Sequence, residues 1–99
     1  MTRDQALSIL RANRAEIESF GVRSIALFGS VARDEATADS DIDILVEFKP
    51  EERVGIFRFL DLKQYSESIL GRSVDLVTRA ALRPELRERI LKDAIDAAA

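Results

Sequence analysis

Two aspartates, separated by a single isoleucine, stand at the start of a stretch over residues 41–48 in which apolar residues recur at alternate positions. Alternation with a period of two predicts a β-strand, whose successive side chains point to opposite faces. Asp41 and Asp43 would then share one face, with Cα atoms roughly 6–7 Å apart. Carboxylates held so close repel each other unless a cation lies between them. Because Mg²⁺ prefers carboxylate oxygens together with substrate phosphates, the pair predicts a metal-dependent phosphoryl or nucleotidyl transfer site.

A calcium loop or a solvent-facing strand edge could also account for these aspartates. A calcium loop would use the acids at positions 39, 41 and 43, but Ile44 stands where such a loop needs glycine and Pro50 where it needs glutamate. At a strand edge, acidic side chains discourage pairing with another chain. The sequence excludes the calcium loop and leaves the strand edge open.

Composition narrows the possible chemistry. The 99 residues are 46% apolar and 33% charged, which is typical of one globular domain spanning residues 1–99. No apolar run reaches the roughly 20 residues of a membrane span, and no secretory pattern opens the chain, so a cytoplasmic location is expected. Without histidine or cysteine, the usual zinc sites and Ser-His or Cys-His pairs are excluded. A net charge of −3 argues against direct nucleic-acid binding.

Periodicity predicts alternating helices and strands. Helices are expected over residues 2–19, with a capping box from Thr2 to Gln5, over residues 54–70, and from Pro84, where Leu86, Ile90, Leu91 and Ala94 form an apolar face. Strands are expected over residues 22–28, 41–48 and 73–78, with a helical turn at 29–33, a polar loop at 34–40 and a frayed tail at 97–99. The fold class is therefore α/β (α+β), a small mixed sheet covered by helices mainly on one face. The pattern does not give the strand order.

Three further features flank the aspartate pair. Gly29 and Ser30 follow a buried strand, where glycine lets the backbone approach a ligand and exposed N–H groups favour a triphosphate. Taken alone, the two residues fit an ordinary tight turn with a serine cap better than a triphosphate site. Arg33 either reaches that triphosphate or pairs with a nearby acid. Asp75 sits inside the third apolar run and would join the pair if the two strands are neighbours. Three converging carboxylates suit a two-metal transfer site.

The combined motifs resemble a known family. The segments 29–33, 40–46 and 74–77, read as GSVAR, SDIDILV and VDLV, are similar to the minimal nucleotidyltransferases of the DNA polymerase beta superfamily. The resemblance implies the nucleotidyltransferase fold and a catalytic, metal-binding triad of Asp41, Asp43 and Asp75. It also implies nucleotide-binding residues Gly29, Ser30, Arg33 and Ser40. Asp34 departs from the pattern, because relatives often carry glycine there.

Proteins of this kind are commonly antitoxins paired with a helical HEPN-domain ribonuclease. The resemblance therefore implies Mg²⁺-dependent transfer of AMP from ATP to a tyrosine hydroxyl of that toxin, with two Mg²⁺ ions and an oligomeric toxin complex. A non-catalytic antitoxin that captures its partner is the alternative. Transfer to a small molecule is a third possibility, for which so short a chain shows no substrate pocket.

Overall fold

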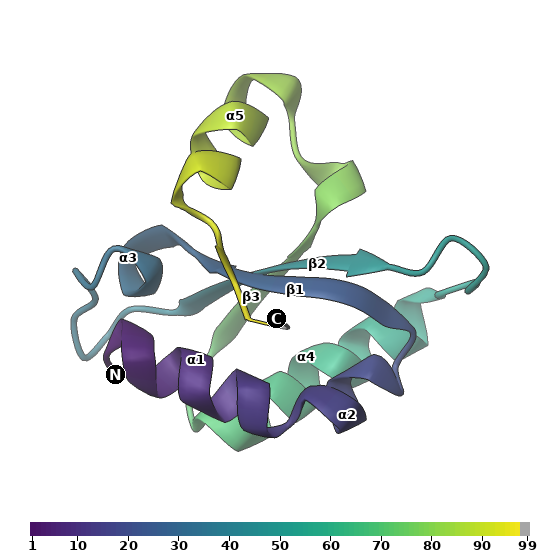
Figure 1. Ribbon diagram of the computed structural model, residues 1–99, viewed down its shortest axis with the longest axis horizontal. Coiled ribbons are helices and arrows are strands. Elements are labelled where there is room, and N and C mark those ends of the chain that lie inside the picture. Colours follow the sequence, from purple (N-terminus) through teal and green to yellow (C-terminus); the bar gives the residue numbers. More distant parts are fainter. Residues whose placement is uncertain (98–99) are drawn as a thin grey trace.

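The computed structural model describes residues 1–97, which form a four-stranded sheet and five helices (Figure 1). The helices are α1 (Arg3–Ala12), α2 (Arg14–Glu18), α3 (Gly29–Ala32), α4 (Ile56–Leu70) and α5 (Pro84–Asp93), and a 3₁₀ turn spans Arg79–Ala81. The strands are β1 (Val22–Phe28), β2 (Ile42–Phe48), β3 (Val74–Thr78) and β4 (Ile95–Asp96).

The sheet is mixed, with the strand order β3-β2-β1-β4. Strand β1 is antiparallel to both β2 and β4, whereas β2 and β3 are parallel. A parallel pair needs a long crossover, and helix α4 supplies it between β2 and β3. Strand β2 is therefore paired on both sides, and β3 lies at one edge of the sheet.

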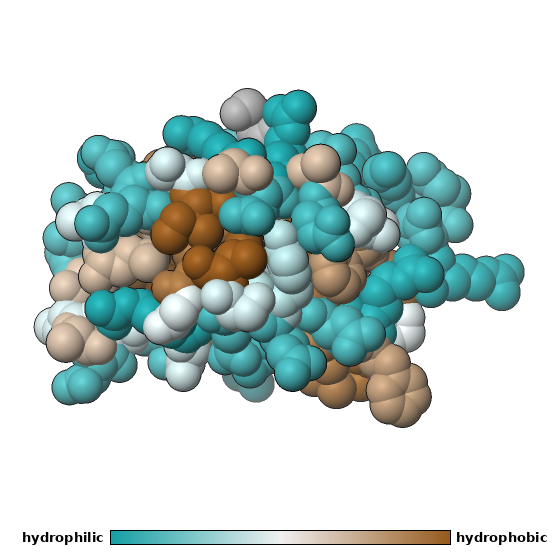
Figure 2. Space-filling view, turned by 90° about the horizontal axis from the view of Figure 1, so that it is seen from below, coloured by the Kyte–Doolittle hydropathy of each residue, from teal (hydrophilic) through white to brown (hydrophobic). Residues whose placement is uncertain are grey.

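Helices cover the two faces of the sheet unequally. Helices α1, α2 and α4 lie on one face and α5 stands on the other (Figure 1). The larger core lies under the three helices and takes the fully buried side chains of Ile42, Ile44 and Val46 from β2. A smaller cluster on the α5 face contains Phe28 and Leu45, with partly buried α5 residues against it. Figure 2 shows the helical face, where apolar side chains gather between polar ones. The predicted α/β fold with a mixed sheet is confirmed.

The prediction of one N-terminal helix over residues 2–19 is wrong. The helix breaks at Asn13, whose backbone leaves the helical conformation at φ −108° and ψ 19°. The Asn13 side chain donates to the carbonyl of Ile9 at 2.8 Å, a local hydrogen bond that competes with the helical ladder. The predicted capping box is present, since Thr2 and Gln5 each bond the other's backbone N–H.

The chain end also differs from the prediction of a frayed tail. Strand β4 pairs with β1, and the N–H of the buried Ala97 donates to the carbonyl of Ile25 at 2.9 Å. Two residues are too few to show an alternating pattern, so this strand was missed. The last two alanines of the predicted tail lie outside the described residues.

Two helices leave large apolar side chains exposed. Helix α4 begins at Ile56, after Gly55, rather than at residue 54. Its first turns expose the large apolar side chains of Phe57 (81%) and Leu60 (47%). In α5, Leu86 is 42% exposed while Ile90 and Leu91 pack on the smaller cluster. Within residues 1–97, no helix is both long and apolar enough to cross a membrane.

Asp34 occupies the loop position where a glycine was expected from the resemblance. Its φ of 59° lies in the left-handed region that glycine prefers, and aspartate tolerates this region better than most residues. The Asp34 carboxylate accepts the backbone N–H of Arg3 at 3.1 Å, in the first turn of α1. An acidic group there satisfies an unpaired donor and opposes the positive end of the helix dipole.

We expect Asp34→Ala to lower the free energy of unfolding by about 2 kcal/mol, because alanine loses the cap and strains the backbone. Asp34→Asn is the matched control, since asparagine keeps an acceptor and tolerates positive φ. Urea denaturation of the three proteins measures the difference. An Asp34→Ala midpoint equal to that of the native chain would contradict this assignment.

Candidate functional site

The predicted carboxylates gather where β2 and β3 begin. The Cα of Asp43 in β2 pairs directly with that of Asp75 in β3. Partners in adjacent parallel strands project to the same face, across a strand spacing of about 4.8 Å. A solvent-facing strand edge therefore does not account for Asp43, because β2 is an interior strand.

Asp41 lies one residue before β2 and is exposed, whereas Asp43 is half-buried. The pKa of Asp43 is raised, first by its burial and then by the charges of Asp75 and Asp41, while Arg33 opposes the rise. Such like-charge effects act over short distances, so all three carboxylates contribute to one local field. A cation between them would relieve this repulsion.

Gly29 brings the backbone against Asp43. Its φ of +73° lies in the left-handed region, and a Cβ built on it would collide with Oδ2 of Asp43 and lie 2.9 Å from its Cγ. Only glycine allows this approach without a shift. Strand β1 ends opposite Asp43, at its partner Phe28, so the turn at Gly29 and Ser30 opens directly beside the carboxylate.

Arg33 and Ser40 are held by neighbours from this chain. Arg33 donates to Glu35 at 3.1 Å and to Asp93 of α5 at 3.2 Å, and these hydrogen bonds raise its pKa above the ordinary value. The Ser40 hydroxyl accepts the N–H of Thr37 at 2.9 Å and so closes a turn. Of the two alternatives for Arg33, the structure contains the pairing with acids. A nucleotide-binding role for Arg33 or Ser40 stays a prediction.

Glu67 was missed by sequence reasoning. From α4, its carboxylate accepts the backbone N–H of Val74 at 3.0 Å and the ammonium of Lys63 at 3.4 Å. Val74 is the first residue of the edge strand and directly precedes Asp75. Lys63 and Glu67 have the i, i+4 spacing of an ordinary helix pair, whereas the backbone contact depends on tertiary packing that no sequence motif indicates.

We expect Glu67→Gln to make the stability of the protein less sensitive to acid. The hydrogen bond from Val74, followed by that from Lys63, lowers the pKa of Glu67. A lowered folded-state pKa stabilises the fold above the unfolded-state value of about 4.3, and this stability is lost as the pH falls through the folded-state value. Denaturation curves from pH 7 to pH 3 should show a smaller loss for Glu67→Gln. Parallel curves would contradict the expectation.

The donor set can be compared with the needs of Mg²⁺. Within residues 1–97, no three acidic side chains form a group that could hold a metal ion as they stand. Mg²⁺, however, commonly takes only one or two protein carboxylates and completes its shell with substrate phosphates and water. The aligned Asp43 and Asp75, with Asp41 beside them, fit a Mg²⁺–nucleotide complex rather than a metal caged by protein alone.

A mixed sheet with aligned aspartates beside a glycine-serine turn places the protein in the class of nucleotidyltransferase folds. Sequence comparison agrees, since a profile described as a nucleotidyltransferase domain matches residues 7–97. The chain is 42% identical over 96 residues to the protein adenylyltransferase MntA of Thermococcus cleftensis, covering 96% of this chain and 95% of that relative. The chain therefore belongs to the nucleotidyltransferase domain family, and the predicted enzyme class is confirmed.

Solved structures support the same assignment. A candidate minimal nucleotidyltransferase has a TM-score of 0.73 at 39% identity, over 96% of this chain and 95% of that one. A toxin–antitoxin structure with AMP-PNP gives 0.67 at 24% identity, over 98% and 73% of the chains. A complex of tri-AMPylated Shewanella oneidensis HEPN toxin with its MNT antitoxin gives 0.58 at 23% identity, over 87% and 69%. The last two likenesses concern the fold alone.

Proposed function

We propose that this nucleotidyltransferase is an antitoxin that transfers AMP from ATP to a tyrosine hydroxyl of a partner HEPN ribonuclease. The observation that carries the proposal is the alignment of Asp43 with Asp75 on neighbouring strands, with the backbone of Gly29 packed closely against the Asp43 carboxylate. The name of the Thermococcus relative supports AMP transfer to a protein, and the toxin–antitoxin complexes of the same fold support the partner.

In the proposed reaction, the acceptor oxygen attacks the α-phosphorus of ATP. A new oxygen–phosphorus bond forms, the bond to the bridging oxygen breaks, and pyrophosphate leaves. Asp41, Asp43 and Asp75 would hold two Mg²⁺ ions, which lower the pKa of the attacking hydroxyl and offset the charge on the pyrophosphate.

The chain's own residues divide the remaining work. Asp75 is exposed on the edge strand, so it faces the side from which a protein acceptor can approach and helps to take the hydroxyl proton. Gly29 and Ser30 bring backbone N–H groups toward the triphosphate. The half-buried Asp43 lies between the other two carboxylates. It pairs with Asp75 on the neighbouring strand, and Asp41 is two residues before it in the chain.

The partner's mass after incubation with ATP and Mg²⁺ tests the proposal. The partner to be tested would be sought in the neighbouring gene, as a small helical protein with an Arg-x4-His pattern. An added AMP, absent when EDTA is present, supports the enzyme, and tyrosine is then identified by fragmentation of the modified peptide. An unmodified but tight complex would instead support the alternative, an antitoxin that acts by capture.

A further inference from the structure

Two consecutive residues hold the chain on either side of Asp41. The Arg72 guanidinium donates to the carbonyl of Ala38 at 2.8 Å, three residues before Asp41. The carbonyl of Ser73 accepts the N–H of Ile42 at 2.9 Å, one residue after it. Both contacts come from the turn between α4 and β3, so this turn fixes the short segment that carries the aspartate.

Asp41 needs such support because it lies outside β2. Its loop, residues 34–41, has no ladder of backbone hydrogen bonds, and the turn from Thr37 to Ser40 is closed locally by the Ser40 hydroxyl. Without a tie to the rest of the fold, that turn could move as a unit and carry Asp41 with it. The Arg72 contact with Ala38 ties the turn to the edge of the sheet.

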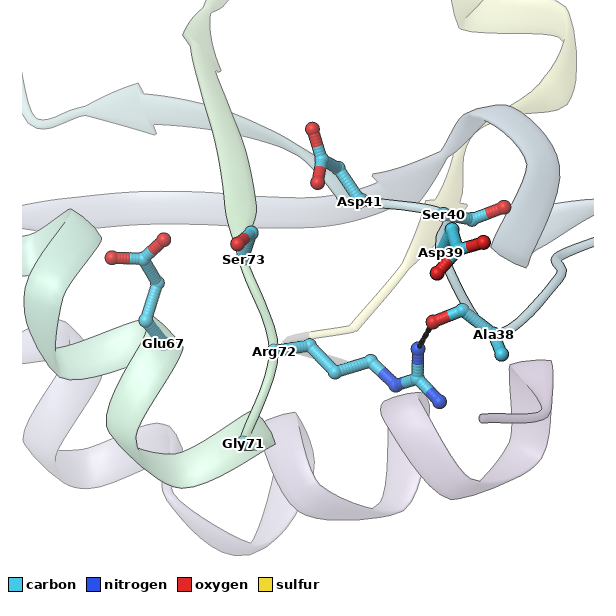
Figure 3. A pocket seen from close by; sticks show the side chains of 8 residues that line it. All are labelled: Ala38, Asp39, Ser40, Asp41, Glu67, Gly71, Arg72 and Ser73. Carbon is cyan, nitrogen blue, oxygen red and sulfur yellow. Dashed lines mark hydrogen bonds between the residues drawn. The ribbon is translucent and has the colours of Figure 1, made fainter.

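Arg72 does not act by touching the aspartate. In Figure 3 its side chain extends to Ala38, while the carboxylate of Asp41 points away from the guanidinium. The same turn continues into Val74, which Glu67 holds, and then into Asp75 opposite Asp43. Residues 72–75 therefore connect the support of Asp41 to the position of the other two carboxylates.

We propose that Arg72 is a positioning residue, which holds the loop of Asp41 so that this carboxylate meets Asp43 and Asp75 at the metal–nucleotide site. The inference rests on the proposed function, because it assigns Asp41 to that site. Residues that orient metal ligands typically change metal affinity by about 10–100-fold when they are removed.

The decisive variant is Arg72→Met, which keeps an unbranched apolar stem and removes the guanidinium donors that reach Ala38. Arg72→Lys restores one donor that can reach the carbonyl of Ala38. Arg23→Met is the matched control, because it removes the same charge from an exposed ion pair with Glu47, at the far end of β1.

The first measurement is amide hydrogen exchange across the loop. Arg72→Met should speed exchange at Ser40, whose N–H donates to the carbonyl of Thr37, while exchange in β1 stays as in the native chain. The second measurement is the affinity of the protein for Mn²⁺ in the presence of α,β-methylene ATP, monitored by electron paramagnetic resonance. Affinity should fall about tenfold in Arg72→Met, recover in Arg72→Lys and stay unchanged in Arg23→Met.

Unchanged exchange at Ser40 in Arg72→Met would overturn the inference, and so would faster exchange with native Mn²⁺ affinity. Failure of Arg72→Lys to recover affinity would also count against it. These readouts are separate from AMP transfer to the partner. If the native chain bound Mn²⁺ and nucleotide but transferred no AMP, the proposed function would fail while the role of Arg72 would still be decided.

Discussion

Asp43→Asn is expected to slow AMP transfer about a thousandfold while the protein remains folded. Asparagine keeps the shape of the side chain but loses the negative charge that would bind Mg²⁺ in the centre of the site. Loss of about 4 kcal/mol of transition-state stabilisation would slow transfer roughly a thousandfold. Incorporation of labelled AMP into the partner measures the rate, with Asp61→Asn on the exposed side of α4 as the matched control.

The same variant should be more stable than the native chain when no metal is present. Because the pKa of Asp43 is raised in the folded state, the native chain loses stability as the pH rises from the unfolded-state value of about 3.9 through the folded-state value. Asparagine cannot ionise and avoids that loss. Denaturation in EDTA at pH 3 and pH 7 tests the sign. Wild-type transfer by Asp43→Asn would show that the three acids are wrongly assigned.

Gly29→Ala is expected to damage both the fold and the reaction. The new methyl group would collide with the Asp43 carboxylate, and alanine at a φ of +73° is itself strained. We expect a loss of about 2 kcal/mol in the free energy of unfolding. Displacement of Asp43 by about 1 Å would slow transfer about a hundredfold.

Matched substitutions at Gly71 and Gly55 separate the effect of backbone strain from that of the collision with Asp43. Gly71 has a φ of +67° and open space around its Cβ position, so Gly71→Ala carries the backbone strain without crowding a carboxylate. Gly55 has a φ of −83° and also has open space, so Gly55→Ala should be nearly neutral. Thermal unfolding and AMP incorporation would be measured for all three. A Gly29→Ala protein as active as Gly55→Ala would contradict the close approach to Asp43.

Periodic patterns predicted most of the fold because they depend on local burial. The strand at residues 22–28 matches β1, and the other two strands differ by only one residue at their starts. The break at Asn13 was missed because it arises from one side chain bonding its own helix. The pairing of Ala97 with Ile25 was missed because it joins distant parts of the chain.

The candidate site shows the same division. Alternation indicated that Asp41 and Asp43 share a face, but their alignment with Asp75 required the strand order, which periodicity does not contain. The sequence indicated the conformational freedom of Gly29, but not its close approach to Asp43, because that contact depends on the tertiary structure. Glu67 and Arg72 carried no motif, since each acts through a backbone group that any residue would offer.

The position of β3 at the border of the sheet has a consequence for turnover. Asp75 is open to solvent on a strand with one unpaired side, while its neighbour Asp43 on β2 is half-buried. A folded macromolecule can therefore present a single protruding side chain there without any hinge or lid first swinging aside. We expect the speed of each cycle to depend on docking and departure of the acceptor rather than on an internal gate.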